Sequence, residues 1–134
     1  MTVIRTLCLA AGLAAALHFS PAPAAEALII VQRSPLAGFR HYGGGEMWPD
    51  MKVGDRLELV REPDNPYDAN AIRIDWRGRK LGYVPRRDNA AVARQMDRGA
   101  PLEARVASLR ENRNRSVRIE FEVVAPLASQ GNRE

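Results

Sequence analysis

The stretch at residues 61–76, REPDNPYDANAIRIDW, constrains the fold more than any other part of the sequence. Pro63 and Pro66 fix their own φ angles and hold the residues before them in an extended conformation, so the stretch begins as a rigid loop and not as a helix. Short polar side chains that hydrogen-bond to their own backbone are able to close such a loop. Four of them follow one another here: Asp64, Asn65, Asp68 and Asn70.

The second half of this stretch has the pattern of a strand. Ile72, Ile74 and Trp76 alternate with Arg73 and Asp75, which predicts one buried and one exposed face. A rigid polar loop that leads into a half-buried strand holds side chains in fixed positions, which is how many binding sites are built. This favours a site at the loop, with Tyr67 and Asp68 in it.

Further short segments also have strand patterns. The apolar run at residues 27–31 predicts a strand buried on both faces, and residues 56–61 and 80–84 predict two more, the last entered through a tight turn at Arg77-Gly78. Residues 102–107 and 117–123 alternate and close the domain, with a charged hairpin turn between them. Gly43-Gly44-Gly45 predicts a flexible loop, either an ordinary hairpin tip or a rim where a ligand approaches closely.

One helix is predicted. Asp88 is a suitable N-cap, Ala90 to Met96 are helix formers, and Gly99 stands where a left-handed glycine often ends a helix. Because helices do not alternate with strands along the chain, a doubly wound fold is excluded. The pattern predicts a mainly β protein: a small OB-like β-barrel of about six strands with one packed helix.

The first 24 residues have the features of a secretory signal peptide. Arg5 precedes an apolar run at residues 7–19, and Ala22-Pro23-Ala24 forms a small-x-small cleavage site. The run is too short for a permanent membrane span, and the surroundings of Cys8 do not resemble a lipoprotein box. We therefore expect cleavage after Ala24, a periplasmic or secreted protein, a domain at residues 25–124 and a disordered tail at residues 125–134.

Composition excludes several classes of site. Removing Arg5 from the 20 basic residues leaves 19 against 16 acidic ones, a net charge of +3 that is compatible with an anionic ligand. After the expected cleavage no cysteine remains and His41 is the one histidine, so neither a disulfide framework nor structural zinc is expected. No serine, cysteine or glycine-rich motif predicts a nucleophile or a nucleotide cofactor. We expect a binding module without metal or cofactor, and no enzyme.

Residues 61–72 and 80–86, with AGFRHY at residues 37–42, resemble the HIRAN domain family. The resemblance covers about residues 28–124 and implies a small β-barrel. The family is best known from modules of fork-remodelling DNA helicases that hold the 3′ end of single-stranded DNA. His41 departs from the family pattern, because a tyrosine stands there in the best-known eukaryotic relatives.

The resemblance implies a nucleic-acid site in which each residue type has a distinct role. An arginine fork suits a phosphate, an aromatic ring stacks on a base, and a carboxylate accepts a hydrogen bond from a terminal hydroxyl but repels a terminal phosphate. The candidate binding residues are Arg40, His41, Tyr42, Tyr67, Asp68, Lys80, Tyr83, Arg86 and Arg87. A structural interpretation stays open, in which Asp68 and Asn70 cap the loop and Tyr67 packs on the barrel.

Three functions remain open at this point. The first is a module that binds single-stranded DNA and prefers a free 3′ hydroxyl. The second is an envelope module that binds a protein through the same loop face, and salt dependence separates the two. The third and weakest is a hydrolase that uses Asp64 and Asp68 as paired carboxylates.

Overall fold

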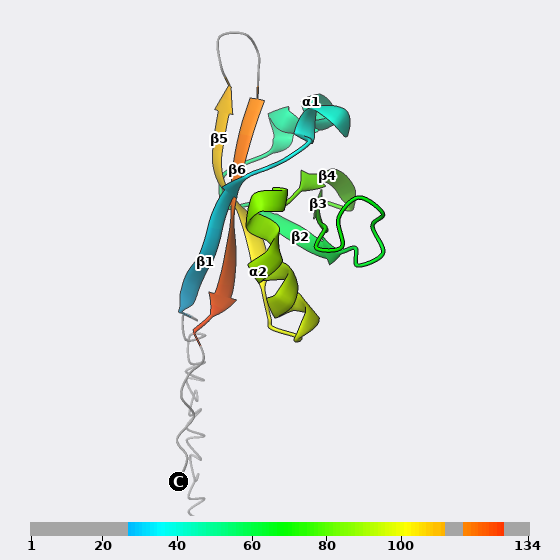
Figure 1. Cartoon of the computed structure of the whole chain (residues 1–134). Coiled ribbons are helices and arrows are strands. Elements are labelled where there is room, and N and C mark those ends of the chain that lie inside the picture. Colours follow the sequence, from blue (N-terminus) through cyan, green and yellow to red (C-terminus); the bar gives the residue numbers. More distant parts are fainter. Residues whose placement is uncertain (1–26, 112–116, 128–134) are drawn as a thin grey trace, which may run out of the picture.

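The computed structural model describes residues 27–111 and 117–127 (Figure 1). Six strands, two α-helices and two 3-10 helices follow one another along this part of the chain. In order they are β1 (Leu28–Pro35), η1 (Phe39–His41), α1 (Gly44–Met47), η2 (Trp48–Asp50), β2 (Arg56–Arg61), β3 (Ile72–Trp76), β4 (Arg79–Tyr83), α2 (Arg86–Asp97), β5 (Glu103–Glu111) and β6 (Val117–Pro126).

The strands form one antiparallel sheet in the order β1-β6-β5-β2-β3-β4. The sheet is strongly bent and is not fully closed, because β1 and β4 are its two edges. One bridge brings the two edges together: Ala37 and Tyr83 exchange two backbone hydrogen bonds of 3.0 Å. The prediction of a mainly β, barrel-like fold of six strands with one packed helix is confirmed.

Gly82 makes this bridge possible. A β-carbon built at this position would lie 2.2 Å from the carbonyl oxygen of Ala37, well inside van der Waals contact. Only glycine allows the backbone after β1 to approach β4 so closely.

The core lies inside the bend of the sheet and is covered by α2. Ile72, Ile74 and Trp76 are buried, as the alternation predicts, and Val92 and Ala93 of α2 pack into the same cluster. Asp75, predicted to be exposed, is also buried, and its carboxylate is paired with Arg73 at 2.9 Å. A buried carboxylate is tolerated when a cation accompanies it.

The turn between β3 and β4 has the predicted form. Arg77 and Gly78 both have positive φ, 48° and 76°, which are the angles of a two-residue hairpin turn that matches the twist of the strands. Strand β2 has the predicted bounds. Both elements follow from local pattern and turn chemistry alone.

Helix α2 begins two residues before the predicted N-cap. Pro85, whose φ is already fixed near −55°, occupies the N-cap position, so Asp88 lies in the first turn and the prediction that Asp88 is the N-cap is wrong. The Asp88 carboxylate instead accepts a hydrogen bond from the Ser34 hydroxyl at 3.0 Å, which ties β1 to the helix. The predicted end is confirmed, because Gly99 follows the helix with a φ of 77°.

The first strand differs from the prediction in its burial. Leu28, Ile29, Ile30 and Val31 are all exposed, so the expectation that this strand is buried on both faces is wrong. The physical reason is the strand order, which places β1 at an edge and leaves the first half of the strand beyond the core. Figure 1 shows this end of β1 and β6 projecting from the rest of the sheet.

The glycine run also differs from the prediction. Residues 44–47 form the short helix α1, whose Met47 is buried in the core, instead of a flexible hairpin tip. Strand β6 runs to Pro126, two residues beyond the predicted end of the domain. Residues 1–24, 112–116 and 128–134, which include the predicted signal peptide and most of the hairpin turn and tail, lie outside the described residues. Within the described ranges, no helix is long and apolar enough to cross a membrane.

Candidate functional site

The loop between β2 and β3 is closed by its own polar groups. The backbone N–H of Tyr67 donates to the Asn65 side-chain oxygen at 2.9 Å, and that of Asn70 donates to Asp68 at the same distance. A backbone bond from Glu62 to Ala71 joins the two ends of the loop. The loop is therefore rigid, as the two prolines and the Asx side chains predict.

Asp68 also connects the loop to α2. Its second oxygen accepts a hydrogen bond of 2.7 Å from Asn89, whose side chain is almost fully buried. The guanidinium of Arg86 lies 3.7 Å from the same oxygen and donates to the backbone carbonyl of Tyr67. Each carboxylate oxygen has a second lone pair, and the Asp68 side chain remains 19% exposed.

A shallow depression of about 450 Å³ lies between this loop, β4 and the start of α2. Its walls are Tyr42 and Ala37 from the segment after β1, Lys80 and Tyr83 from β4, and the loop itself. Tyr67 stands at the rim with 85% of its surface exposed, far more than is usual for a tyrosine. An aromatic ring held in solvent on a rigid loop offers a flat surface for stacking.

One wall of the depression carries a cation between two aromatic rings. The ammonium group of Lys80 lies 4.0 Å from the centre of the Tyr42 ring and 4.4 Å from that of Tyr83. It also donates a 2.8 Å hydrogen bond to the Tyr83 hydroxyl. The two rings meet edge to face at 6.1 Å. A lysine fixed in this way presents a positive charge at a defined place.

Glu62 holds Tyr83 of this wall in place through a hydrogen bond. Its carboxylate accepts hydrogen bonds from Tyr83 at 3.1 Å, Asn65 at 3.0 Å and Arg73 at 3.3 Å. Burial acts to raise the pKa of Glu62, but the hydrogen bonds from Asn65 and Tyr83 and the charges of Arg73 and Lys80 outweigh it and lower the pKa. Glu62 is therefore ionised and orients the Tyr83 hydroxyl.

Two of the charged groups that line the depression, Asp68 and Lys80, are also held in their ionised forms. The backbone hydrogen bond from Asn70 lowers the pKa of Asp68 against the effect of burial, with help from Asn89 and Arg86. For Lys80, burial lowers the pKa, but the Tyr83 hydroxyl and the Glu62 carboxylate together raise it. A fixed cation and a fixed anion acceptor therefore face the same space.

The structure brings together six of the nine predicted binding residues. These six line the depression: Tyr42, Tyr67, Asp68, Lys80, Tyr83 and Arg86. Arg40 and His41 instead line a smaller depression of about 240 Å³ next to it, together with Arg118. The rings of His41 and Tyr42 lie edge to face with their centres 6.4 Å apart. Arg87 lines neither of these two depressions and pairs with Asp88 at 3.5 Å.

Other residues of the site were not among the predicted ones. Asn65, Pro66 and Val84 line the depression, and Glu62 acts through Tyr83. The signal for Asn65 and Pro66 was present, because both belong to the loop that the two prolines define. Nothing in the sequence shows that Glu62 lies under Tyr83, since the two residues are 21 positions apart.

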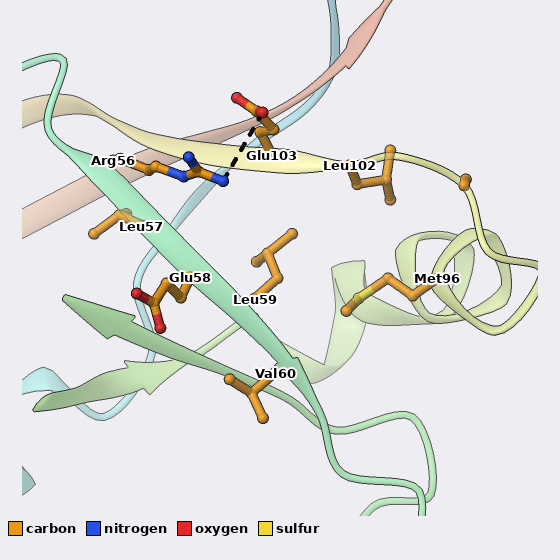
Figure 2. Close-up of a pocket in the computed structure, with 9 residues that line it drawn as sticks. Arg56, Leu57, Glu58, Leu59, Val60, Met96, Leu102 and Glu103 are labelled. Carbon is orange, nitrogen blue, oxygen red and sulfur yellow. Dashed lines mark ion pairs between the residues drawn. The ribbon is translucent and has the colours of Figure 1, made fainter. Parts of the chain in front are cut away.

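A third depression, of about 390 Å³, lies between β2 and the segment that joins α2 to β5 (Figure 2). Figure 2 shows Leu59, Met96 and Leu102 around it, and Arg56 paired with Glu103 at 4.0 Å across its rim. None of the nine predicted binding residues lines it. Among the described residues there is also no cluster of three or more side chains that could hold a metal ion.

Comparisons with known proteins identify the family of the chain. The HIRAN domain family model matches residues 29–128. Helicase-like transcription factor from Mus musculus is 38% identical over 66 residues, and that from Oryctolagus cuniculus is 36% identical over 66 residues. Each match covers 48% of this chain but 6% of the relative, so the similarity concerns one small part of those proteins.

Two solved structures resemble the fold. A crystal structure of a protein from Lactobacillus plantarum is 26% identical with a TM-score of 0.61, covering 75% of this chain and 98% of that one. The crystal structure of the HIRAN domain of human HLTF is 26% identical with a TM-score of 0.57, covering 70% of this chain and 73% of that one.

Proposed function

Because this chain belongs to the HIRAN domain family, we propose that it is a non-catalytic module that binds nucleic acid, specifically single-stranded DNA with a free 3′ hydroxyl. The observation that carries the proposal is the depression beside the β2–β3 loop. It combines a fixed cation, an exposed aromatic ring and a carboxylate within one site on the segments that match the family.

Each group of the site has a role in the proposed complex. The ring of Tyr67 stacks on a base of the terminal nucleotides, which an exposed and rigidly mounted aromatic does without regard to sequence. Lys80 and Arg86 bind backbone phosphates. The positive end of α2 begins at Arg86 and adds to the attraction for an anion.

Asp68 gives the site its proposed preference for a strand that ends in a free 3′ hydroxyl. Both of its oxygens already accept one hydrogen bond, and the remaining lone pairs accept one from a terminal hydroxyl. A terminal phosphate offers no proton at neutral pH and would be repelled by the ionised carboxylate. The same two hydrogen bonds hold the loop, so Asp68 has a structural role as well as the proposed binding role.

The basic test is whether the protein binds single-stranded DNA through a small number of phosphates. Fluorescence anisotropy of residues 25–134 with a short 5′-labelled oligonucleotide would measure this. Two phosphate contacts, from Lys80 and Arg86, predict a loss of affinity of roughly sevenfold between about 50 and 200 mM salt. Absence of binding at low salt would contradict the proposal. Binding without salt dependence would contradict the phosphate contacts.

We also propose that residues 1–24 direct export and are removed after Ala24. The support is the order of Arg5, the apolar run and Ala22-Pro23-Ala24 in the sequence. Expression of the full chain in a bacterial host, followed by fractionation and mass measurement, tests this. A periplasmic species that begins at Ala25 is expected, and an intact chain confined to the cytoplasm would contradict it. An exported HIRAN domain would meet DNA, or a ligand of similar chemistry, outside the cytoplasm.

A further inference from the structure

The first half of β1 is an edge of the sheet with which, apart from β6, no strand of residues 27–111 and 117–127 pairs. Leu28, Ile29, Ile30 and Val31 have 43, 51, 57 and 36% of their surface exposed, and Leu127 beside them has 55%. Leu28 and Ile30 share one face of the strand and Ile29 points to the other, so apolar groups are exposed on both faces. Isolated exposed apolar residues are common, but four consecutive ones on an edge strand, with a fifth beside them, are not.

The opposite edge of the sheet is protected. Strand β4 is short, contains Arg79 and Lys80, and is joined to Ala37 through the bridge at Tyr83. Charged residues, short strands and covering segments are the usual means by which proteins keep edge strands from pairing with other chains. Residues 28–32 of β1 have no charged residue and no proline.

At two residues of this edge, the backbone N–H and C=O groups point away from the sheet. The backbone N–H of Leu127 donates to the Ala27 carbonyl, so Ala27 and, by alternation, Ile29 direct their backbone groups toward β6. Leu28 and Ile30 therefore direct theirs away from the sheet. No other strand of the described residues pairs with this edge.

We propose that this half-strand pairs with the same half-strand of a second copy of the chain, in an antiparallel arrangement about a two-fold axis at Ile29. In this register the backbone N–H and C=O groups of Leu28 in one copy pair with those of Ile30 in the other copy. Ile30 of the first copy pairs with Leu28 of the second in the same way, which gives two hydrogen-bonded residue pairs. Ile29 lies opposite its own equivalent. Every side chain brought together is apolar, so a two-fold arrangement juxtaposes no like charges.

The observations favour a second copy over an unrelated partner because the strand is complementary to itself. A charged partner strand would place its charges against the apolar side chains of residues 28–31, whereas a second copy places none there. The interface is small, so we expect weak association, with dimers forming at concentrations on the order of 0.1 mM and above. The depression beside the β2–β3 loop lies on other strands, so the proposal does not depend on the proposed function.

Sedimentation equilibrium of residues 25–134 over a range of concentrations tests the proposal. The described core consists of residues after position 38, so removal of the first 24 residues leaves it unchanged. We expect a reversible monomer–dimer equilibrium that Ile30→Lys shifts by at least tenfold toward monomer. Val53→Lys, at an equally exposed apolar residue elsewhere, is the matched control and should leave the equilibrium unchanged. Monomers at every concentration, or equal effects of the two substitutions, would overturn the proposal.

The register can be tested directly because residues 25–134 contain no cysteine. Opposed residues of a non-hydrogen-bonded antiparallel pair lie about 4.5 Å apart between their α-carbons, which permits a disulfide. Ile29→Cys should therefore form a covalent dimer under mild oxidation, and Val53→Cys should not. A dimer that cross-links equally through both positions would contradict the β1 interface.

Discussion

The ammonium group of Lys80 lies 2.8 Å from the hydroxyl of Tyr83 and 4.0 Å from the centre of the Tyr42 ring. These contacts fix the cation of the site on the wall that faces Tyr67 and Asp68. Glu62 completes the arrangement by accepting a hydrogen bond from the same hydroxyl. The proposed function depends on this arrangement.

Replacing Lys80 tests whether its ammonium group contacts a phosphate. Lys80→Gln should weaken binding of single-stranded DNA and reduce the slope of log affinity against log salt by about 0.7, the value for one phosphate contact. Lys52→Gln is the natural control, because Lys52 is exposed and does not line the depression. Titrations at several salt concentrations measure both slopes. Equal slopes for the two variants would show that Lys80 does not contact a phosphate.

Removing the exposed ring should affect binding and not stability. Tyr67→Ala is expected to weaken binding about 5- to 150-fold, the range for loss of one stacked base. Because the ring is 85% exposed, the melting temperature should change little. Tyr67→Phe keeps the stacking surface and should retain most of the affinity. Full affinity in the alanine variant would remove Tyr67 from the site.

The contribution of Glu62 to the stability of the fold should decrease at acid pH. The folded-state pKa of Glu62 lies below its ordinary value, so its contribution is present above about pH 4 and is lost as the pH falls through the folded-state pKa. We expect the difference in melting temperature between the wild type and Glu62→Gln to be largest at neutral pH and to shrink toward pH 3. Asp64→Asn, on the exposed part of the same loop, provides the comparison. A difference that stays constant with pH would contradict the ionised hydrogen-bonded carboxylate.

The close approach at Gly82 predicts a large effect of a single methyl group. Gly82→Ala should lower the free energy of unfolding by about 1–3 kcal/mol, because the new β-carbon would meet the Ala37 carbonyl and separate β4 from the segment after β1. Gly45→Ala, where no atom lies within 4 Å of the new carbon, should be neutral or slightly stabilising. Urea denaturation of both variants measures the difference. Equal stability of the two would show that the bridge is flexible.

The sequence was sufficient for the elements that depend on local chemistry. The hairpin at Arg77-Gly78, the proline loop and the helix end at Gly99 each follow from the conformational preferences of one or two residues. The N-cap of the helix was predicted three residues late, at Asp88 instead of Pro85, because both are good starting residues and the pattern alone does not rank them. The glycine run was predicted to be a flexible loop. The sequence does not show that Met47, which follows it, is buried in the core and fixes the segment.

The sequence was not sufficient where the order of strands decides the outcome. An apolar run such as residues 27–31 has the same pattern whether it lies in the centre of a sheet or at an edge, and in this fold it lies at an edge. The sequence also does not show that Arg40 and His41 line the smaller depression and not the larger one. Gly38, with a φ of 81°, turns the chain into a 3-10 helix that directs Tyr42 to the larger depression and the two preceding residues to its neighbour.

Recognition of the 3′ hydroxyl is tested most directly by comparing two DNA ends. Residues 25–134 would be titrated with one single-stranded oligonucleotide that ends in a 3′ hydroxyl and with the same oligonucleotide that ends in a 3′ phosphate. We expect the 3′ phosphate to weaken binding about tenfold or more, because Asp68 then has no hydroxyl to accept a hydrogen bond from and repels the added charge. We also expect that Asp68→Asn, checked for folding, reduces this difference. Equal affinity of the wild type for both ends would contradict recognition of the 3′ hydroxyl.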